Sequence, residues 1–77
     1  MVDPALDARL ERLKRTRNQL AARLELAPGV LCPNGTLEEI ARGNPGTLEE
    51  LAALPSVRRW QAATFGAELL EAVQGAG

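Results

Sequence analysis

The tetrapeptide Thr-Leu-Glu-Glu occurs twice, at residues 36–39 and 47–50, and this duplication constrains the fold more than any other feature. Each copy has the form of a capping box: the threonine hydroxyl accepts from the backbone N–H three residues on, and the glutamate there accepts from the threonine N–H. The expected pairs are Thr36 with Glu39 and Thr47 with Glu50. The copies begin eleven residues apart, separated by the turn-like Gly43-Asn44-Pro45-Gly46. We therefore expect short helices at about 37–42 and 48–53, which need a larger bundle because such short helices are unstable alone.

The segments on either side predict two longer helices. Asp3 is a good N-cap and Pro4 suits the first helical position, so the first helix should run from there to about Ala27. At about 100° per residue its leucines form one buried stripe. The stripe comprises Leu6, Leu10, Leu13, Leu20, Ala21 and Leu24. Ser56 should cap a last helix over about 57–74.

The remaining apolar residues complete the expected core. A connector of Val30, Leu31 and Cys32 should pass beneath the bundle, with Cys32 acting as a small buried hydrophobe. The middle helices should contribute Leu37, Ile40, Ala41, Leu48, Leu51 and Ala52, with Leu54 beside them, and the last helix Trp60, Ala63, Ala67 and Leu70, flanked by Phe65, Leu69 and Val73. Gly66 lies inside that helix at a cost of about 1 kcal/mol relative to alanine, which predicts close approach of another backbone, that of the first helix.

These elements predict an all-α fold: a compact single-domain bundle of about five short helices, spanning residues 1–77 with its core at about 6–74. Histidine is absent and Cys32 is the one cysteine, which argues against a disulfide, a metal site or a histidine base and favours a reducing, cytoplasmic setting. Capping and the helix dipole explain the paired glutamates, so we expect no catalytic residue and no cofactor. No apolar run is long enough to span a bilayer, and no signal peptide is recognisable.

Charge is unevenly distributed although the net charge is only −1. Residues 1–30 carry six basic and four acidic side chains, whereas residues 31–77 carry three and six. On the first helix four arginines share one flank of the polar surface, where they could follow a phosphate backbone. They are Arg9, Arg12, Arg15 and Arg23. The alternative is a solvated face held by weak ion pairs along the helix.

Three further sites have competing interpretations. Arg17 points among the core leucines, so a structural role is favoured, with its guanidinium on a carboxylate or on carbonyls at a helix end. Arg58 and Arg59 begin the last helix, where the helix dipole disfavours cations, and a bound phosphate would resolve that conflict. The alternative is that they pair with Glu49 or Glu50. Trp60 could stack on a base, although its spacing favours a core position.

An ordered set of motifs from about Leu10 to Val73 resembles the HRDC domain, the helicase and RNase D C-terminal module. The motifs are Leu13-Lys14-Arg15-Thr16-Arg17, Ala27-Pro28-Gly29-Val30-Leu31, Thr36-Leu37 with Ile40-Ala41, Pro45-Gly46-Thr47 with Leu51, Leu54-Pro55-Ser56-Val57, and Phe65-Gly66 with Leu69-Leu70. The resemblance implies a non-catalytic bundle attached to a RecQ-type DNA helicase or an RNase D-type exonuclease. It also implies a role in selecting or holding structured or single-stranded nucleic acid, or in protein contacts.

Two departures from that family pattern bear on function. Where RecQ-type members can present an exposed aromatic after the first helix, this chain has Gly29. Where they often read Gly-Val-Gly before the last helix, this chain has Ser56-Val57-Arg58, and Arg58-Arg59-Trp60 is closer to RNase D-type members. Both departures remove features that would contact a nucleic acid.

The leading hypothesis is an accessory module of a RecQ-type helicase, excised from a larger bacterial, nucleoid-associated enzyme. It would bind single-stranded or partial-duplex DNA weakly, through arginine–phosphate contacts, as a monomer and away from membranes. One alternative is a docking domain for a protein or for the catalytic core of its own enzyme, favoured by near-neutral charge and by Gly29. A second is the equivalent domain of an RNase D-type ribonuclease.

Overall fold

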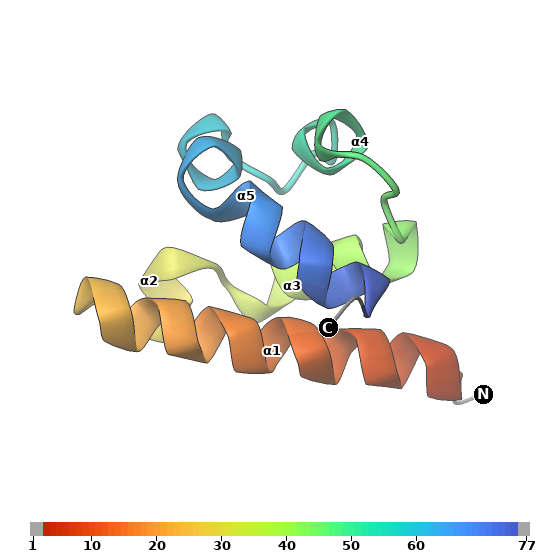
Figure 1. Cartoon of the computed structure of the whole chain (residues 1–77), viewed down its shortest axis with the longest axis horizontal. Helices are drawn as coiled ribbons and strands as arrows, with labels where there is room; N and C mark the ends of the chain where they lie inside the picture. The colour runs from red at the N-terminus through yellow and green to blue at the C-terminus, as the bar shows by residue number, and fades with distance from the viewer. Residues whose placement is uncertain (1–2, 76–77) are drawn as a thin grey trace.

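The computed structural model describes residues 3–75, and within them the chain forms five helices and no strand (Figure 1). The helices are α1 (Pro4–Leu24), α2 (Pro28–Leu31), α3 (Asn34–Gly43), α4 (Leu48–Ala52) and α5 (Arg59–Gln74). The predicted all-α bundle is therefore confirmed. The long α1 is the base of the molecule, α3 and α5 pack against it, α4 packs against α5, and α2 lies beside the C-terminal part of α1.

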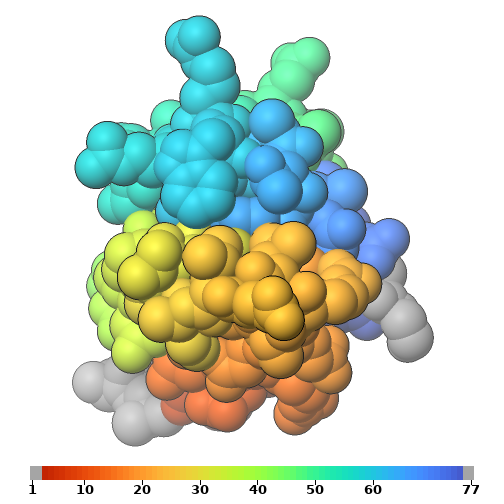
Figure 2. All heavy atoms as spheres, turned by 90° about the vertical axis from the view of Figure 1, so that its left-hand side faces the viewer, coloured from red at the N-terminus to blue at the C-terminus, as the bar shows by residue number. Residues whose placement is uncertain are grey.

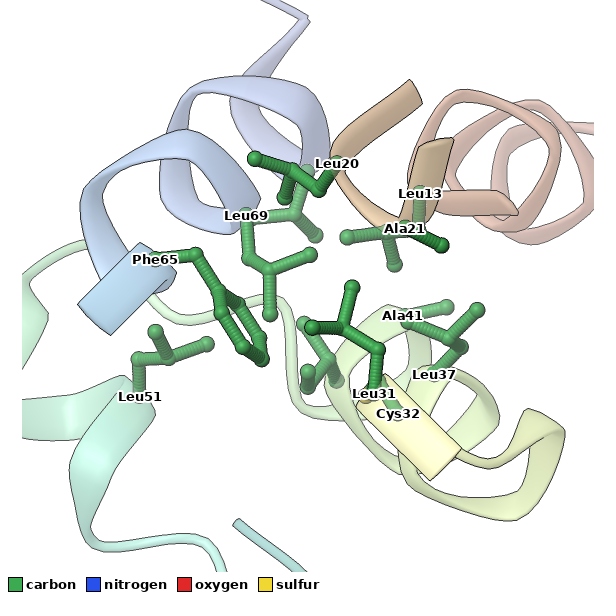
Figure 3. Packing of buried hydrophobic residues seen from close by; sticks show 12 residues of the cluster. Leu13, Leu20, Ala21, Leu31, Cys32, Leu37, Ala41, Leu51, Phe65 and Leu69 are labelled. Carbon is green, nitrogen blue, oxygen red and sulfur yellow. The ribbon is translucent and has the colours of Figure 1, made fainter. Parts of the chain in front are cut away.

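One hydrophobic core joins all five helices (Figure 3). Its buried members are Leu13, Leu20, Ala21, Leu31, Cys32, Leu37, Ile40, Ala41, Leu51, Phe65, Leu69 and Val73. Leu6, Leu10 and Leu54 pack against this cluster while remaining partly exposed. Because each short helix contributes only a few apolar side chains, the bundle is stable only as a unit.

The start of α1 is as predicted, but its end is not. Asp3 Oδ1 accepts from the backbone N–H of Ala5 at 3.0 Å and of Leu6 at 3.4 Å, with Pro4 in the first turn. The helix ends at Leu24 rather than Ala27 because Glu25 adopts a left-handed conformation with φ 57°. Leu24 was predicted to belong to the buried stripe, but as the last residue of α1 it is 44% exposed.

The first capping box is a wrong prediction. Pro33 is the N-cap of α3, and its carbonyl accepts from the N–H groups of Thr36 and Leu37, so the helix is already under way when the chain reaches Thr36. Thr36 is buried, and its hydroxyl donates to the carbonyl of Ser56 at 3.5 Å. The carboxylate of Glu39 accepts from the N–H and the hydroxyl of Ser56. This tetrapeptide therefore ties α3 to the loop before α5.

The second box is confirmed in half. Thr47 Oγ1 accepts from the N–H of Glu50 at 3.1 Å, as expected of an N-cap. The carboxylate of Glu50 accepts from the N–H of Gly46 at 2.8 Å instead of that of Thr47. Gly46, the residue before the N-cap, thus donates the hydrogen bond that Thr47 was expected to donate. In α4 only Leu51 is buried, and the expected core residues Leu48 and Ala52 are exposed.

The buried face of α5 differs from the predicted one. Arg58, not Ser56, is the N-cap, and the buried residues follow a spacing of four. They are Gln61, Phe65, Leu69 and Val73, with Gly66 beside them. Trp60 is 47% exposed, Ala63 and Ala67 are exposed, and Leu70 is half-buried. Phe65 has φ −143° and ψ 19°, which interrupts the helix and changes its phase relative to a regular wheel.

Two smaller expectations also need correction. At Gly66 an added Cβ would lie 2.8 Å from Leu48 Cδ1 and 3.4 Å from Leu51 Cδ2, so the close approach comes from side chains of α4 and not from α1. The connector after α1 includes the short helix α2, in which Val30 is 65% exposed while Leu31 and the following Cys32 are buried as predicted.

Candidate nucleic-acid interface

Arg58 and Arg59 lie side by side in the sequence at the exposed start of α5. Among residues 3–75 the ion pair within 4.0 Å is Arg42 with Glu38, so neither Arg58 nor Arg59 has a carboxylate partner there. The expected alternative, pairing with Glu49 or Glu50, is not formed. Two adjacent exposed cations without carboxylate partners make the start of α5 a basic point of the described surface; Lys14 and Arg15 on α1 are a second adjacent pair without such a partner among these residues.

A buried glutamine fixes the position of this basic point. Gln61 is 4% exposed; its Oε1 accepts from the N–H of Arg58 at 2.8 Å and its Nε2 donates to the carbonyl of Leu31 at 3.1 Å. The start of α5 is therefore hydrogen-bonded to the end of α2. Sequence reasoning missed Gln61. The available signal was a glutamine three residues after an N-cap, the position where a capping box places its returning side chain.

Trp60 follows the two arginines and is not the core residue its spacing predicted. Its ring lies edge to face with that of Phe65, at a centroid distance of 5.9 Å and an interplanar angle of 83°, yet the residue is 47% exposed. Figure 2 shows that the end of α1, α2 and the start of α5 share one face of the molecule. Exposed apolar residues also occur at the end of α1, after it and in α2: Leu24, Leu26 and Val30.

The predicted basic strip on α1 is partly used inside the protein. Arg9 Nε donates to the carbonyl of Ala41 at 2.9 Å, near the end of α3. Arg12 donates from Nε to Ala72 at 2.8 Å and from Nη2 to Val73 at 3.1 Å, near the end of α5. Because the last carbonyls of a helix lack intrahelical partners, these two arginines cap the neighbouring helices.

The other two arginines of the strip face different surroundings. Arg15 is exposed and, at 100° per residue, lies almost opposite the buried Leu13 and Leu20 on α1. Arg23 lines a hollow of about 300 Å³ together with Glu68 and Glu71, whose charges oppose phosphate binding. The four residues that share a flank on the helical wheel therefore do not form one continuous basic surface.

Arg17 is buried and bonded, as expected for a structural role. Its Nη1 donates to the carbonyl of Cys32 at 3.1 Å and to Asn34 Oδ1 at 2.6 Å, and its Nε donates to Asn18 Oδ1 at 3.0 Å. These bonds join α1 to the junction between α2 and α3. Burial raises the pKa of the adjacent Cys32 thiol to about 11, so this cysteine is unreactive at neutral pH.

Comparison with known proteins assigns the chain to a family. The family model of the HRDC domain matches residues 7–73. The chain belongs to the HRDC domain family. No match was found among curated proteins or among solved structures. HRDC domains are non-catalytic accessory domains, generally associated with nucleic acid, and the five-helix bundle agrees with that assignment.

Two further observations describe the chemistry of this HRDC domain. Within the described residues no three His, Cys, Asp or Glu side chains are grouped to hold a metal ion, and no helix there is long and apolar enough to cross a membrane. Gly29, at the position where an aromatic would be expected in RecQ-type members, has open space around it.

Proposed function

We propose that this HRDC domain is a weak accessory nucleic-acid-binding module of a RecQ-type DNA helicase. It holds single-stranded or partial-duplex DNA for the catalytic core of the larger enzyme and so tunes which substrates that core acts on. The observation that carries the proposal is the pair Arg58 and Arg59, exposed, adjacent and without a carboxylate partner among residues 3–75. In a bacterial cell the module would act in the cytoplasm, at the nucleoid.

The number of available cations sets the expected strength. Arg9, Arg12 and Arg17 donate to groups of the protein itself, and Arg23 lies beside two glutamates. With two phosphate contacts from Arg58 and Arg59, the logarithm of the binding constant should fall with the logarithm of salt at a slope of about −1.4 for a single strand. Raising salt from about 50 to about 200 mM should then weaken binding about sevenfold.

Fluorescence anisotropy of labelled single-stranded and partial-duplex DNA tests the proposal. The domain is titrated at low and at physiological salt, and the slope is compared with that of Arg58→Glu, Arg59→Glu and the double variant. We expect each single variant to lower affinity and the double variant to abolish it, because a carboxylate repels phosphate.

Arg15→Glu is the matched control, since it makes the same charge change at an exposed arginine on the far side of α1. Equal losses of DNA affinity in Arg15→Glu and Arg59→Glu would show that affinity depends on net charge alone, which would contradict a defined interface. Absence of binding by the wild-type domain at low salt and high protein concentration would refute direct nucleic-acid contact.

The alternative function is docking to a protein or to the catalytic core of the same enzyme. The exposed Leu24, Leu26 and Val30 favour it. So does a mainly apolar hollow of about 320 Å³ between α4 and α5, which is lined by Leu48, Glu49, Ala52, Arg59, Ala62 and Ala63. Deleting the domain discriminates the two functions. A nucleic-acid module changes substrate preference, whereas a docking domain needed by the core changes activity on every substrate equally. If the titration is repeated with labelled RNA, tighter binding to RNA than to DNA would favour an RNase D-type enzyme.

A further inference from the structure

Trp60 is a large aromatic side chain left half-exposed, and it directly follows the two arginines of the interface in the sequence. On a regular wheel Trp60 lies about 140–180° from Phe65, Leu69 and Val73, so burial of that face leaves the indole at the surface. Tryptophan is enriched at interfaces, because its ring offers an apolar body with a polar N–H.

The indole is held by one ring contact, and the backbone beside it is fixed by a hydrogen bond of the next residue. The ring of Phe65 meets it edge to face at 5.9 Å, and Phe65 itself is 1% exposed and fixed in the core. The next residue, Gln61, donates a hydrogen bond to the carbonyl of Leu31, so the backbone at Trp60 is fixed to the end of α2. A braced aromatic loses little conformational freedom when a ligand stacks on it.

The surrounding charge selects the kind of ligand. Arg58 and Arg59 immediately precede Trp60 in the sequence, at the exposed start of α5. A half-exposed aromatic ring and two cations without carboxylate partners among residues 3–75, all at the start of one helix, complement a ligand that combines aromatic rings with anionic groups. Nucleotides joined by phosphates have that combination, and base stacking on aromatic residues with arginines along the backbone is how single strands are held.

We propose that Trp60 is a stacking platform for an unpaired base, with Arg58 and Arg59 holding the phosphates on either side of that base. This proposal rests on the proposed function and makes it more specific, because bases within a duplex are already stacked and cannot present a face to the indole. The domain should therefore prefer single strands, or the single-stranded part of a partial duplex, to a fully paired duplex.

The chain contains one tryptophan, so its intrinsic fluorescence reports on this ring alone. The wild-type domain is titrated with a short oligothymidylate, with an abasic oligonucleotide of equal length, and with a blunt duplex. We expect quenching by the oligothymidylate, and weaker binding without comparable quenching by the abasic strand, which supplies phosphates but no bases. Equal quenching by the two strands would overturn the stacking assignment.

Affinity measurements on labelled oligothymidylate provide the second arm. Trp60→Ala should lower affinity about fivefold or more, since one stacked base contributes about 1–3 kcal/mol. Trp60→Phe should lose less, because a smaller ring still stacks. Gln19→Ala is the control, as Gln19 is an exposed side chain of α1 outside the proposed interface.

The outcomes separate the two proposals. If Trp60→Ala binds as tightly as the wild type while the Arg58→Glu, Arg59→Glu double variant does not bind, stacking is overturned and the phosphate interface stands. If no oligonucleotide binds the wild type, both proposals are overturned. Because the quenching experiment uses the unmodified chain, the result does not depend on whether Trp60→Ala folds.

Discussion

Replacing Arg17 by methionine should destabilise the domain by about 1–3 kcal/mol, although the arginine is only one of nine basic residues. Arg17 is 8% exposed, and its Nη1 donates to the carbonyl of Cys32 in a buried position. Methionine keeps most of the aliphatic stem but leaves that carbonyl without its donor, and an unsatisfied buried acceptor has this cost. The bonds to Asn18 and Asn34 add little, because both residues are exposed and water can replace the guanidinium.

The expected loss of unfolding free energy is large relative to the total stability of the domain. A domain of this length has an unfolding free energy of roughly 4–12 kcal/mol, and each kcal/mol shifts the Tm by about 4–8 °C. Urea unfolding followed by far-UV circular dichroism measures the loss directly. Arg15→Met is the matched control on the same helix; Arg15 is exposed and bonds to nothing among the described residues, so its loss should stay within about 0.5 kcal/mol.

One result would refute this reasoning. Burying a guanidinium removes it from water, and if that penalty exceeded the value of its bonds, methionine would be as stable as arginine or more so. Equal midpoints for Arg17→Met and Arg15→Met would therefore show that the hydrogen bonds do not compensate the desolvation. Arg17→Lys should fall between wild type and methionine, because a single ammonium keeps the charge without the planar fork.

The other predictions concern three sites away from the interface. Gly66→Val should destabilise by about 1–3 kcal/mol, because the new side chain meets Leu48, and much of that loss should disappear in a Leu48→Ala background; thermal melts of the four proteins give the coupling. Bonds from the hydroxyl and then the N–H of Ser56 lower the pKa of Glu39, so the stability it contributes is present above the ordinary carboxyl pKa and lost as pH falls through the folded value. Acid melts should therefore show less pH dependence for Glu39→Gln than for wild type. With its pKa at about 11, about one Cys32 thiol in a thousand is ionised at pH 8, so labelling by a disulfide reagent should proceed only through opening and speed up with urea; fast labelling without urea would contradict the burial.

Sequence reasoning found the helices because their signals are local. Asp3 and Thr47 cap the helices they were expected to cap, and the stripe through Leu13 and Leu20 is buried. It failed where a residue distant in sequence supplied the hydrogen-bond partner that a local residue was expected to supply. Glu39 has the spacing to return to Thr36, but Ser56 supplies two donors to its carboxylate, and the carbonyl of Pro33 closes the first turn earlier.

The candidate site shows the same limit more strongly. A helical wheel places Arg9 and Arg12 on a solvent flank, but it cannot show that the carbonyl ends of α3 and α5 lie against that flank. On α5 the wheel offers two apolar faces about 140–180° apart, that of Trp60 and that of Phe65, Leu69 and Val73, and it cannot show which of them meets the other helices. The arginines at the start of α5 were found because they violate a local rule, that of charge at a helix N-terminus.

If the proposed function holds, the way the arginines are divided makes nucleic-acid binding by this domain of net charge −1 weak. Three of them stabilise the bundle by bonding to carbonyls, and Arg42 pairs with Glu38, so these are not free to hold a phosphate backbone. The proposed interface uses the two arginines that begin α5, so it has two phosphate contacts and one stacked base, too few for tight binding at physiological salt. Weak contact suffices for a module joined to an enzyme, because a tether can hold it at an effective concentration in the millimolar range. In that arrangement a small interface biases substrate choice without slowing release, which is the behaviour expected of an accessory domain.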